Sequence, residues 1–506
     1  MTATSYLSPS DLGLPSKFTE FRPAQLEALE YIAASNSRFI ACGLPTGSGK
    51  SALAIAAAKL LGMRAVYLTA TKGLQDQVAK EFSKAGVIDI RGRNNYNCPT
   101  FADTCDKGIE DDCDYATTAL CPYTAAVEKA KSSPLTVTNY AYWLHARGNN
   151  SSALEYSNDP IELLICDEAH EAPEQLASYL RVEISAHSKS DKGRMPNDHW
   201  QEFALERMLE VNARMVEFDG GRSDTYKELE EERRKYIQIQ RMDDNWVWQS
   251  DGHKVWFDVI WPGQYAKALW SGVGKVLLMS ATLRPYTLSL LGLKRDDYDF
   301  KEWPAVFQPA RNPVYHIPTA KLTWKSTDED YANIIRRMDE IISLRSDRRG
   351  IIQTISYERA RRACRESKFA DRMLWNSDGR ETNNTLALFR SGGSKSILVS
   401  PSFKAGYDFP LTECEYQIIL KTPYPDTSSA VEAARCEVND GDYRMYVAMQ
   451  DLVQMCGRGM RSSDDRCETF IIDNGVTWLL SRGKKHSPGW FKVWTVNQIP
   501  PPAPKL

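Results

Sequence analysis

The stretch Arg38-Phe-Ile-Ala-Cys-Gly-Leu-Pro-Thr-Gly-Ser-Gly-Lys-Ser51 decides the fold of this chain. It begins as a short apolar strand, continues as a loop of small residues, and leads into a helix that we expect to start near Ser51. Backbone N–H groups in such a loop can surround phosphate oxygens, while the lysine reaches the β- and γ-phosphates and the final hydroxyl binds Mg²⁺. The stretch therefore predicts a nucleotide-phosphate loop that depends on Lys50 and Ser51. Leu44 occupies the position where the strict pattern has glycine.

An acidic pair that could complete such a site follows a later strand, in Leu163-Leu-Ile-Cys-Asp-Glu-Ala-His170. Asp167, at the carboxyl end of the strand, would hold the Mg²⁺ ion. Glu168 would orient and deprotonate the attacking water. Four such residues can occur together by chance, but in combination with the phosphate loop they predict nucleotide hydrolysis.

Positive charge for the transition state is available in Gln454-Met-Cys-Gly-Arg-Gly-Met-Arg461. Arg458 and Arg461 are three residues apart, so on a helix they would share one face. Arginines donated by a second domain can raise turnover roughly 10³–10⁵-fold. The structural alternative is an arginine pair that braces a helix. A site divided between two domains would close on the nucleotide and open after hydrolysis, as a translocating motor requires.

Short apolar strands alternate with helical stretches in the two end parts of the chain, which predicts two α/β domains. Continuous apolar runs bounded by glycine or aspartate are typical of parallel strands that are buried on both faces. We expect parallel sheets with helices on both faces. The runs are Phe39–Gly43, Ala65–Thr69, Leu163–Cys166, Val276–Ser280, Gly350–Thr354 and Ser396–Ser400.

Two regions interrupt this alternation. Residues 96–131 contain four cysteines and little periodicity. Residues 181–245 are polar with helical patterning, and we interpret them as a helical insertion whose charged run at Lys227–Lys235 is a solvated face. Residues 246–260 predict a β-hairpin that returns to the core of the first domain. We interpret the tryptophans of this hairpin as packing residues rather than as a surface that stacks nucleobases.

Composition limits the possible function classes. The 506 residues are too many for one core, and the net charge of −3 means that any nucleic-acid site must be a local groove. No stretch approaches the roughly 20 apolar residues that cross a bilayer, and we expect neither a membrane segment nor a secretory signal. Eleven cysteines, an odd number in a long chain, argue against a disulfide framework. We therefore expect a reducing compartment, either the cytoplasm or the nucleoid or nucleus.

In order along the chain, these residues resemble a superfamily 2 helicase, and specifically the XPD/DinG group of iron–sulfur helicases. The Asp-Glu-Ala-His sequence corresponds to a DEAH box. Two features depart from the family: Ala405 stands where members often have an acidic residue, and the insertion is short for an arch domain. The matching stretches are Phe21–Gln25 (Q-motif), Leu44–Ser51 (motif I), Thr69–Thr71 with Gln75 (motif Ia), Asp167–His170 (motif II), Ser280–Leu283 (motif III), Thr354–Tyr357 (motif IV), Ser402–Asp408 (motif V) and Gln454–Arg461 (motif VI).

The resemblance implies two RecA-like motor domains, the first of which carries an iron–sulfur domain and a helical arch-like insertion. Residues 1–95, 132–180 and 246–305 would form the three parts of motor domain 1. Residues 96–131 would be the iron–sulfur domain, residues 181–245 the arch-like insertion, and residues 306–506 motor domain 2.

The resemblance also implies an activity, that of an ATP-dependent DNA helicase, with ATP, Mg²⁺ and a 4Fe-4S cluster as cofactors. Such an enzyme would move 5′ to 3′ on single-stranded DNA and unwind forked duplex DNA, and we expect it to act as a monomer. The catalytic residues would be Lys50, Asp167, Glu168, Gln454, Arg458 and Arg461. Nucleotide would be bound by Arg22, Gln25, Pro45, Thr46, Gly47, Ser48, Gly49, Lys50 and Ser51, and Mg²⁺ by Ser51 and Asp167.

Four cysteines, Cys98, Cys105, Cys113 and Cys121, are separated by six, seven and seven residues. Four thiolates on an irregular loop suit either a 4Fe-4S cluster or a Cys₄ zinc site. Zinc ribbons favour paired Cys-x-x-Cys sequences, which are absent here, so the spacing favours the cluster. The flanking stretches Gly92–Cys98 and Cys121-Pro122 resemble the iron–sulfur helicases. In that family this domain lines the pore for single-stranded DNA, which implies roles there for Arg91, Arg93 and Tyr96.

Other functions remain open at this point. The chain could be a helicase that acts on RNA or on RNA–DNA hybrids. It could also be a DNA-bound scaffold or an iron–sulfur redox sensor with a vestigial ATPase, although Lys50, Asp167, Glu168 and Arg458 are all present. The Q-motif begins at Phe21, which leaves no room before it for an N-terminal nuclease domain.

Overall fold

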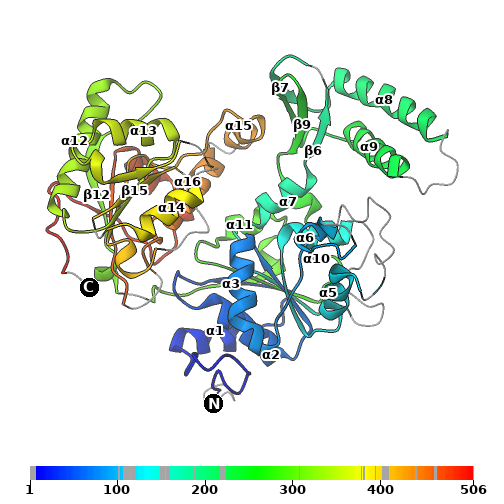
Figure 1. The fold of residues 1–506 in the computed structure, drawn as a ribbon, viewed down its shortest axis with the longest axis horizontal. Helices are drawn as coiled ribbons and strands as arrows, with labels where there is room; N and C mark the ends of the chain where they lie inside the picture. Colours follow the sequence, from blue (N-terminus) through cyan, green and yellow to red (C-terminus); the bar gives the residue numbers. More distant parts are fainter. Residues whose placement is uncertain are drawn as a thin grey trace.

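Two large parallel sheets and one small antiparallel sheet organise the chain (Figure 1). The computed structural model describes residues 7–100, 103–105, 118, 120–148, 154, 160–186, 188–216, 224–306, 308–377, 379, 382–393, 395–401, 409–438, 441–460 and 464–504. The two large sheets belong to separate α/β domains, here named domain 1 and domain 2. The small sheet belongs to an insertion in domain 1.

Domain 1 is built on a seven-stranded sheet with the order β11-β1-β10-β5-β2-β4-β3, in which all pairs are parallel. Its strands are β1 (Phe39–Gly43), β2 (Ala65–Thr69), β3 (Ile88–Asp89), β4 (Leu135–Asn139), β5 (Leu163–Cys166), β10 (Lys275–Ser280) and β11 (Tyr298–Glu302). Its helices are α1 (Pro23–Ala34), α2 (Lys50–Leu61), α3 (Lys72–Phe82), α5 (Pro122–Lys131), α6 (Tyr140–Gly148), α7 (Ala172–Leu180), α10 (Lys267–Trp270) and α11 (Pro285–Leu290).

Separate apolar cores cover the two faces of this sheet. Helices α1, α2 and α3 pack on one face, and α6, α7 and α11 pack on the other. Every residue of β1, β2 and β5 is buried, as continuous apolar strands between two helical layers must be. The predicted α/β class, with parallel strands and helices on both faces, is confirmed.

Domain 2 repeats this plan with the strand order β14-β15-β13-β16-β17-β12-β18. Its strands are β12 (Val314–Ala320), β13 (Gly350–Gln353), β14 (Met373–Trp375), β15 (Ile397–Ser400), β16 (Tyr416–Ile419), β17 (Glu468–Asp473) and β18 (Trp494–Thr495). Its helices are α12 (Asp328–Leu344), α13 (Tyr357–Glu366), α14 (Thr382–Ser391), α15 (Ala430–Glu437), α16 (Asp442–Cys456) and α17 (Gly475–Arg482).

The insertion leaves domain 1 after α7 and contains more sheet than the sequence predicts. It consists of the antiparallel sheet β6-β9-β8-β7 and a long helical hairpin. Figure 1 shows this hairpin projecting away from domain 1. Its elements are β6 (Val182–Ser185), β7 (Asp191–Arg194), α8 (Asp198–Val216), α9 (Asp224–Gln240), β8 (Trp246–Ser250) and β9 (Lys254–Val259).

The predicted hairpin at residues 246–260 forms, but it does not join the core of domain 1. Its strands β8 and β9 pair with β6 and β7, so the insertion spans residues 181–260. The reason is aromatic packing: the ring of Trp200 on α8 lies 5.4 Å from the ring of Trp248 and 5.9 Å from that of Phe257. These rings fill the core of the insertion, and Trp246 is buried there as well.

The proline-rich C-terminal segment lies against domain 2. Arg345 donates a hydrogen bond to the carbonyl of Pro500 at 3.1 Å, Arg466 donates to that of Pro504 at 2.8 Å, and Arg348 donates to that of Ala503. Proline lacks an N–H group but keeps its carbonyl as an acceptor, so arginines are suitable partners for such a segment. No helix among the described residues is both long and apolar enough to span a bilayer.

The packing of β13 against β16 can be tested at Gly350, the first residue of β13. A Cβ atom at Gly350 would lie 2.2 Å from the ring of Tyr416 on β16. We expect Gly350→Ala to lower the free energy of unfolding by about 1–3 kcal/mol, because the ring is buried and cannot move away. Chemical denaturation would measure this loss. Gly393→Ala is the matched control, since a Cβ atom there meets no atom within 4 Å. Equal losses in the two variants would contradict the prediction.

Candidate nucleotide site and strand path

The phosphate loop lies at the carboxyl edge of the domain 1 sheet, between β1 and α2. Gly47 and Gly49 have φ values of +77° and +75°, a conformation that glycine adopts without strain. A Cβ atom at Gly49 would lie 2.5 Å from Nε2 of Gln25, so a larger residue would displace that side chain. Leu44, the departure from the strict pattern, is buried in the core, and its N–H bonds to the Ser280 carbonyl at 3.0 Å.

The two Q-motif side chains hold the loop through its backbone. Arg22 donates to the Gly47 carbonyl at 2.6 Å, and Gln25 donates to the Ser48 carbonyl at 2.8 Å. The Gln25 oxygen in turn accepts from the Arg22 N–H at 2.9 Å. A cavity of about 330 Å³ opens beside Arg22 and Gln25, and it is closed on its far side by Trp303 and Val306. Its position next to the phosphate loop suits a nucleobase.

Asp167 and Glu168 follow β5 at the same edge of the sheet. Asp167 is buried, and it accepts hydrogen bonds from the Tyr67 hydroxyl at 2.8 Å and from the Glu168 N–H at 2.9 Å. Burial raises the pKa of Asp167 to about 6, and the nearby charge of Glu168 adds to the shift. The carboxylate is therefore ionised at neutral pH, and a bound cation would favour that state further.

Glu168 is held in an unusual backbone conformation, with φ at +44°. A non-glycine residue in this region carries strain that the surrounding structure must maintain. Its carboxylate lies 3.6 Å from Nζ of Lys50 and accepts from the Ser280 hydroxyl at 3.2 Å. The strained turn thus directs the carboxylate toward the phosphate loop, where an attacking water would lie.

His170 ties this carboxylate to its surroundings. Its Nδ1 lies 2.8 Å from the Ser280 hydroxyl and 3.3 Å from Glu168, and its Nε2 lies 3.3 Å from Glu171. Burial alone would lower the pKa of His170, but the hydrogen bonds with Glu168 and Glu171 outweigh it and raise that pKa to about 10. At neutral pH the ring is therefore a cation between two carboxylates.

A chain of hydrogen bonds runs from this cluster into domain 2. The Ser280 hydroxyl lies 3.3 Å from that of Thr282. On α16 of domain 2, Gln454 donates to the Thr282 hydroxyl at 3.3 Å, and Gln450 donates to the Thr282 carbonyl at 2.6 Å. The structure therefore links the carboxylate of Glu168 to Gln454 of the motif VI stretch, and it adds Gln450, for which the sequence offered no signal.

Arg458 lies just beyond the end of α16 and is buried, with 4% of its surface exposed. Burial lowers the pKa of Arg458 to about 10, although the charges of Glu168 and Glu171 oppose that shift. Next to it, a Cβ atom at Gly457 would lie 3.3 Å from the hydroxyl of Thr46 in the phosphate loop. The structure thus brings Arg458 near Glu168 and Glu171. Arg461 and motif V at residues 402–408 lie outside the described residues.

Tyr67 on β2 is a site residue that sequence reasoning missed. It is fully buried, and its hydroxyl bonds to Asp167 and also interacts with Ser51. These are the two residues predicted to bind Mg²⁺. A hydroxyl and a carboxylate are oxygen donors of the kind that Mg²⁺ prefers, and Tyr67 holds both near one point. The residues therefore fit the ion. In the sequence, Tyr67 is one more residue of an apolar strand.

A larger cavity of about 610 Å³ lies between the two domains beside the phosphate loop. Thr46 and Trp303 line it from domain 1, and Met460, Trp490 and Phe491 line it from domain 2. The carboxylate of Glu302 accepts from the Gly489 N–H at 2.8 Å at its margin. Residues of both domains thus surround the site, which a nucleotide-driven change of domain spacing would alter.

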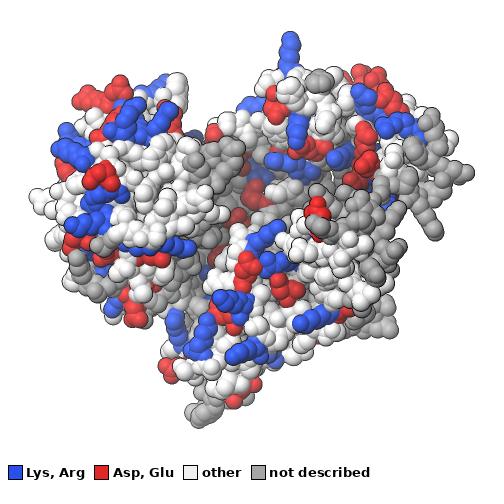
Figure 2. All heavy atoms as spheres, in the orientation of Figure 1, with Lys and Arg blue, Asp and Glu red and all other residues white. Residues whose placement is uncertain are grey.

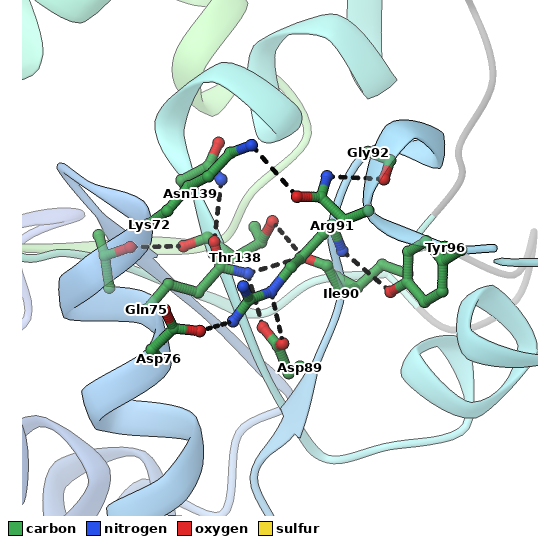
Figure 3. A network of polar contacts seen from close by, with 12 residues as sticks. Lys72, Gln75, Asp76, Asp89, Ile90, Arg91, Gly92, Tyr96, Thr138 and Asn139 are labelled. Atoms are coloured by element: carbon green, nitrogen blue, oxygen red, sulfur yellow. Dashed lines mark hydrogen bonds and ion pairs between the residues drawn. The ribbon is translucent and has the colours of Figure 1, made fainter. Parts of the chain in front are cut away.

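The predicted path of single-stranded DNA near motif Ia differs from expectation. Gln75 on α3 belongs to the motif Ia match, which the resemblance implies lies on the DNA path, but Gln75 is fully buried. Its amide donates to Asp89 at 2.6 Å and to the Ile90 carbonyl at 2.9 Å, and it accepts from Asn139 at 2.9 Å (Figure 3). All of these contacts are internal. Gln75 therefore holds β3 and β4 together and does not contact a DNA strand.

Arg91 belongs to the same network. Its guanidinium lies 2.5 Å from Asp76 and 2.8 Å from Asp89 (Figure 3), so two carboxylates pair with the charge for which the resemblance implied a role in the DNA pore. Near it, Thr71 and Lys72 are exposed, and Lys72 donates to Asn95 at 3.1 Å. Both belong to the exposed part of this edge. Figure 2 shows acidic and basic side chains interspersed on one face of the molecule. This face has a hollow between domain 2 and the rest of the molecule.

Arg93 and Tyr96 pack around the loop that carries Cys98, Cys105 and Cys121, here named the cysteine loop. The Arg93 guanidinium lies 4.1 Å from the centre of the Tyr123 ring and donates to the Cys105 sulfur at 3.7 Å. The Tyr96 ring meets the Tyr123 ring edge-on at 5.6 Å, and its hydroxyl accepts from the Arg91 N–H at 3.2 Å. Both side chains thus contact residues of the loop, and both stay partly exposed.

Three of the four predicted cysteine ligands lie in this loop. Cys98, Cys105 and Cys121 are buried, and the sulfurs of Cys105 and Cys121 are 3.5 Å apart. Cys113 lies outside the described residues. No group of three or more metal-ligating side chains is assembled within the part of the chain that the structure describes.

The two adjacent thiols differ in acidity. Burial would raise the pKa of Cys121, but hydrogen bonds from Thr124, Cys105 and Tyr123 at the start of α5 outweigh it and lower that pKa. Burial and the neighbouring Cys121 raise the pKa of Cys105. Thiolates are the form that binds a metal, so Cys121 is the better prepared of the two.

Comparison with known families gives two matches. Residues 18–192 match the family described as type III restriction enzyme, res subunit. Residues 349–493 match the helicase C-terminal domain. The first match covers the phosphate loop and the acidic pair, and the second covers Gln454 and Arg458. No curated protein matches the chain.

Solved structures with the same fold span nearly the whole chain. A structure named XPD_Helicase superposes with a TM-score of 0.61 at 12% identity, and it covers 94% of this chain and 100% of that one. A structure named XPD_APO gives 0.60 at 12% identity with the same coverage. Xpd4 from S. tokodaii gives 0.57 at 15% identity, again over 94% and 100%. At these identities the likeness shows the fold alone.

The contact between Tyr67 and Asp167 leads to a specific prediction. We expect Tyr67→Phe to raise the Mg²⁺ concentration that half-saturates ATP hydrolysis by about tenfold, because it removes a buried hydrogen bond to a charged ligand. A Mg²⁺ titration of hydrolysis at saturating ATP would measure the shift. Tyr140→Phe is the matched control: Tyr140 is equally buried but donates to the backbone carbonyl of Asp167 at 3.0 Å. The same Mg²⁺ dependence in both variants would refute this role.

Proposed function

We propose that this chain, an XPD-like superfamily 2 helicase by its two domain matches and its fold, moves 5′ to 3′ along single-stranded DNA and unwinds forked duplex DNA. The observation that carries the proposal is the hydrogen-bond chain from Glu168 through Ser280 and Thr282 to Gln454, which crosses from domain 1 to domain 2. Such a chain couples hydrolysis at one domain to the position of the other.

In this proposal each residue of the site has a physical role. Lys50 binds the β- and γ-phosphates, and Ser51 and Asp167 hold Mg²⁺. Glu168 orients the attacking water and takes its proton. Arg458, together with Arg461, neutralises the charge that develops on the transferred phosphoryl group. Domain 2 supplies these arginines, so hydrolysis proceeds fully only when the two domains are closed.

We propose DNA as the substrate from the resemblance of the motifs to the XPD/DinG group and from the XPD structures that share the fold. We propose a reducing compartment, the cytoplasm, nucleoid or nucleus, because eleven cysteines in a long chain argue against a disulfide framework. We propose a monomer as the active form.

The substrate proposal predicts that single-stranded DNA stimulates ATP hydrolysis at least tenfold more than single-stranded RNA does. It also predicts that duplex DNA with a 5′ tail is unwound and that duplex with a 3′ tail is not. Lys50→Ala should abolish both activities, because it removes the phosphate contact. Lys59→Ala, at the far end of the same helix, is the matched control and should retain both. Equal stimulation by RNA would identify an RNA helicase instead, and no stimulation by either would refute the proposal.

We also propose a 4Fe-4S cluster on Cys98, Cys105, Cys113 and Cys121. Three of these thiols lie buried in one loop, beside a guanidinium that would offset thiolate charge. When bound, the cluster would hold the loop rigid. Zinc stays the alternative. Two sulfurs that are each bound to one zinc ion at about 2.3 Å are separated by a distance similar to the 3.5 Å between the Cys105 and Cys121 sulfurs.

The cluster proposal predicts that anaerobically purified protein is brown and contains about four iron and four sulfide per chain. Iron, sulfide and zinc analysis with visible absorbance would measure this. Cys105→Ser should lose most of the iron and the colour, because one ligand is gone. Cys364→Ser, at a buried thiol on α13 of domain 2, is the matched control and should retain both. A colourless native protein that contains zinc would overturn the cluster and leave the ATPase site unaffected.

A further inference from the structure

The insertion contacts domain 2 as well as the domain that carries it. Figure 1 shows α15 extending from domain 2 toward the small sheet of the insertion. The contact lies at the root of the insertion, defined here as Val259, Ile260 and Trp261, where β9 ends and the chain returns to domain 1. The helix α7 of domain 1 reaches the same place. Three parts of the molecule therefore meet at one junction.

Arg435 on α15 is the polar centre of this junction, and only 2% of its surface is exposed. Its guanidinium donates to the Ile260 carbonyl at 2.6 Å and to the Val259 carbonyl at 3.3 Å. It also lies 2.5 Å from the carboxylate of Glu174 on α7 and donates to the Tyr443 hydroxyl at 3.0 Å. One side chain of domain 2 thus binds both the root and α7.

An apolar contact surrounds this polar centre. Val247 and Ile260 of the insertion form one buried cluster with Ala430 and Ala434 of α15, and Trp261 packs at its edge. The Trp261 ring also meets the Tyr443 ring edge-on at 5.8 Å. Burial of apolar surface stabilises the contact without fixing its direction, whereas the guanidinium fixes one geometry because its donors are planar and divergent.

Weaker polar contacts lie at the periphery. The Ala430 N–H donates to Gln249 at 2.9 Å, and Lys192 donates to the Ser428 carbonyl at 2.7 Å. Arg194 on β7 and Glu437 on α15 form an exposed ion pair at 3.1 Å. Exposed pairs of this kind contribute little stability, so the buried Arg435 is expected to dominate the junction.

Helix α7, which carries Glu174, and helix α16, which carries Tyr443, both lead from the junction to the nucleotide site. Helix α7 begins at Ala172, directly after the cluster of Glu168, His170 and Glu171. Helix α16 begins next to Tyr443 and ends next to Arg458, and its Gln454 contacts Thr282. The contacts of Arg435 with Glu174 near the start of α7 and with Tyr443 near the start of α16 therefore connect the junction to the place where Arg458 approaches Glu168.

From this geometry we infer that Arg435 is a positioning residue that couples the nucleotide cycle to the insertion, so that the insertion moves with domain 2. The inference rests on the proposed function and goes beyond it, since it assigns the insertion to the mobile side of the motor. Lysine at this position would keep the charge beside Glu174, but it could not bind the two root carbonyls and Tyr443 together.

Distances between spin labels test the inference directly. Leu209 on α8 and Leu388 on α14 are 59% and 61% exposed, and Gln77 on α3 is also exposed. Labels introduced as unnatural amino acids would leave the cysteines intact. We expect the Leu209–Leu388 distance to stay narrow and constant, and the Leu209–Gln77 distance to change, when ADP with beryllium fluoride and Mg²⁺ is added. In Arg435→Gln we expect the Leu209–Leu388 distance to change and the Leu209–Gln77 distance to stay constant. The width of the Leu209–Leu388 distance distribution should at least double.

The exposed pair provides the matched control. Arg194→Gln removes a contact between the same two elements, and we expect it to leave both distances unchanged. If Arg435→Gln keeps the narrow native distribution, or if Arg194→Gln disturbs it as strongly, the inference is overturned. Should Arg435→Gln fail to fold, Arg435→Lys keeps the charge beside Glu174 but cannot bind both root carbonyls. Native distances in Arg435→Lys would count against the inference.

A second readout separates coupling from stability. We expect Arg435→Gln to unwind at least threefold fewer base pairs per ATP hydrolysed, with Arg435→Lys intermediate and Arg194→Gln unchanged. A purely structural role would lower the melting temperature and leave this ratio at its native value. The distance measurements need no helicase activity. A protein that shows the expected distances but no nucleic-acid-stimulated hydrolysis would therefore refute the proposed function and not the junction.

Discussion

The structure depends on one constraint, which is that the carboxylate of Glu168 must be held in a fixed orientation at a boundary between two domains. Lys50 and His170 provide positive charge within domain 1, and Ser280 donates to it. Thr282 continues the chain to Gln454, so part of the arrangement exists only when domain 2 is in contact. Charged groups in a water-poor site interact strongly, and a small change in domain spacing therefore changes the chemistry.

Much of this site could be predicted from the sequence because its residues occupy fixed places on local structure. A strand followed by a glycine-rich loop and a helix puts Lys50 and Ser51 at the start of α2, and the end of β5 puts Asp167 at the same edge of the sheet. Tyr67 and Gln450 could not be found in this way. Each lies on a buried strand or helix, where sequence patterns register apolar periodicity and carry no information about which polar group will be met across the core.

The predicted path of the DNA strand shows the opposite failure, in which exposed roles were inferred for residues that are engaged by neighbouring side chains. Arg91 and Gln75 are polar and near motif Ia, but Asp76, Asp89 and Asn139 satisfy them. Those partners come from separate elements, and only the tertiary fold brings them together. The hairpin at residues 246–260 follows the same logic, since alternation predicts strands but does not determine their partners.

The position of the junction within the insertion has a mechanical consequence. Arg435 binds at the root, while α8 extends for 19 residues beyond it, or about 28 Å at 1.5 Å per residue. A rigid element that is held near one end moves farthest at the other, so a small rotation of domain 2 would become a displacement of several ångströms at the tip. The aromatic core around Trp200 provides the stiffness that this requires. An insertion shorter than an arch domain could therefore still act on a strand, because its stiffness and its attachment to domain 2 compensate for its length.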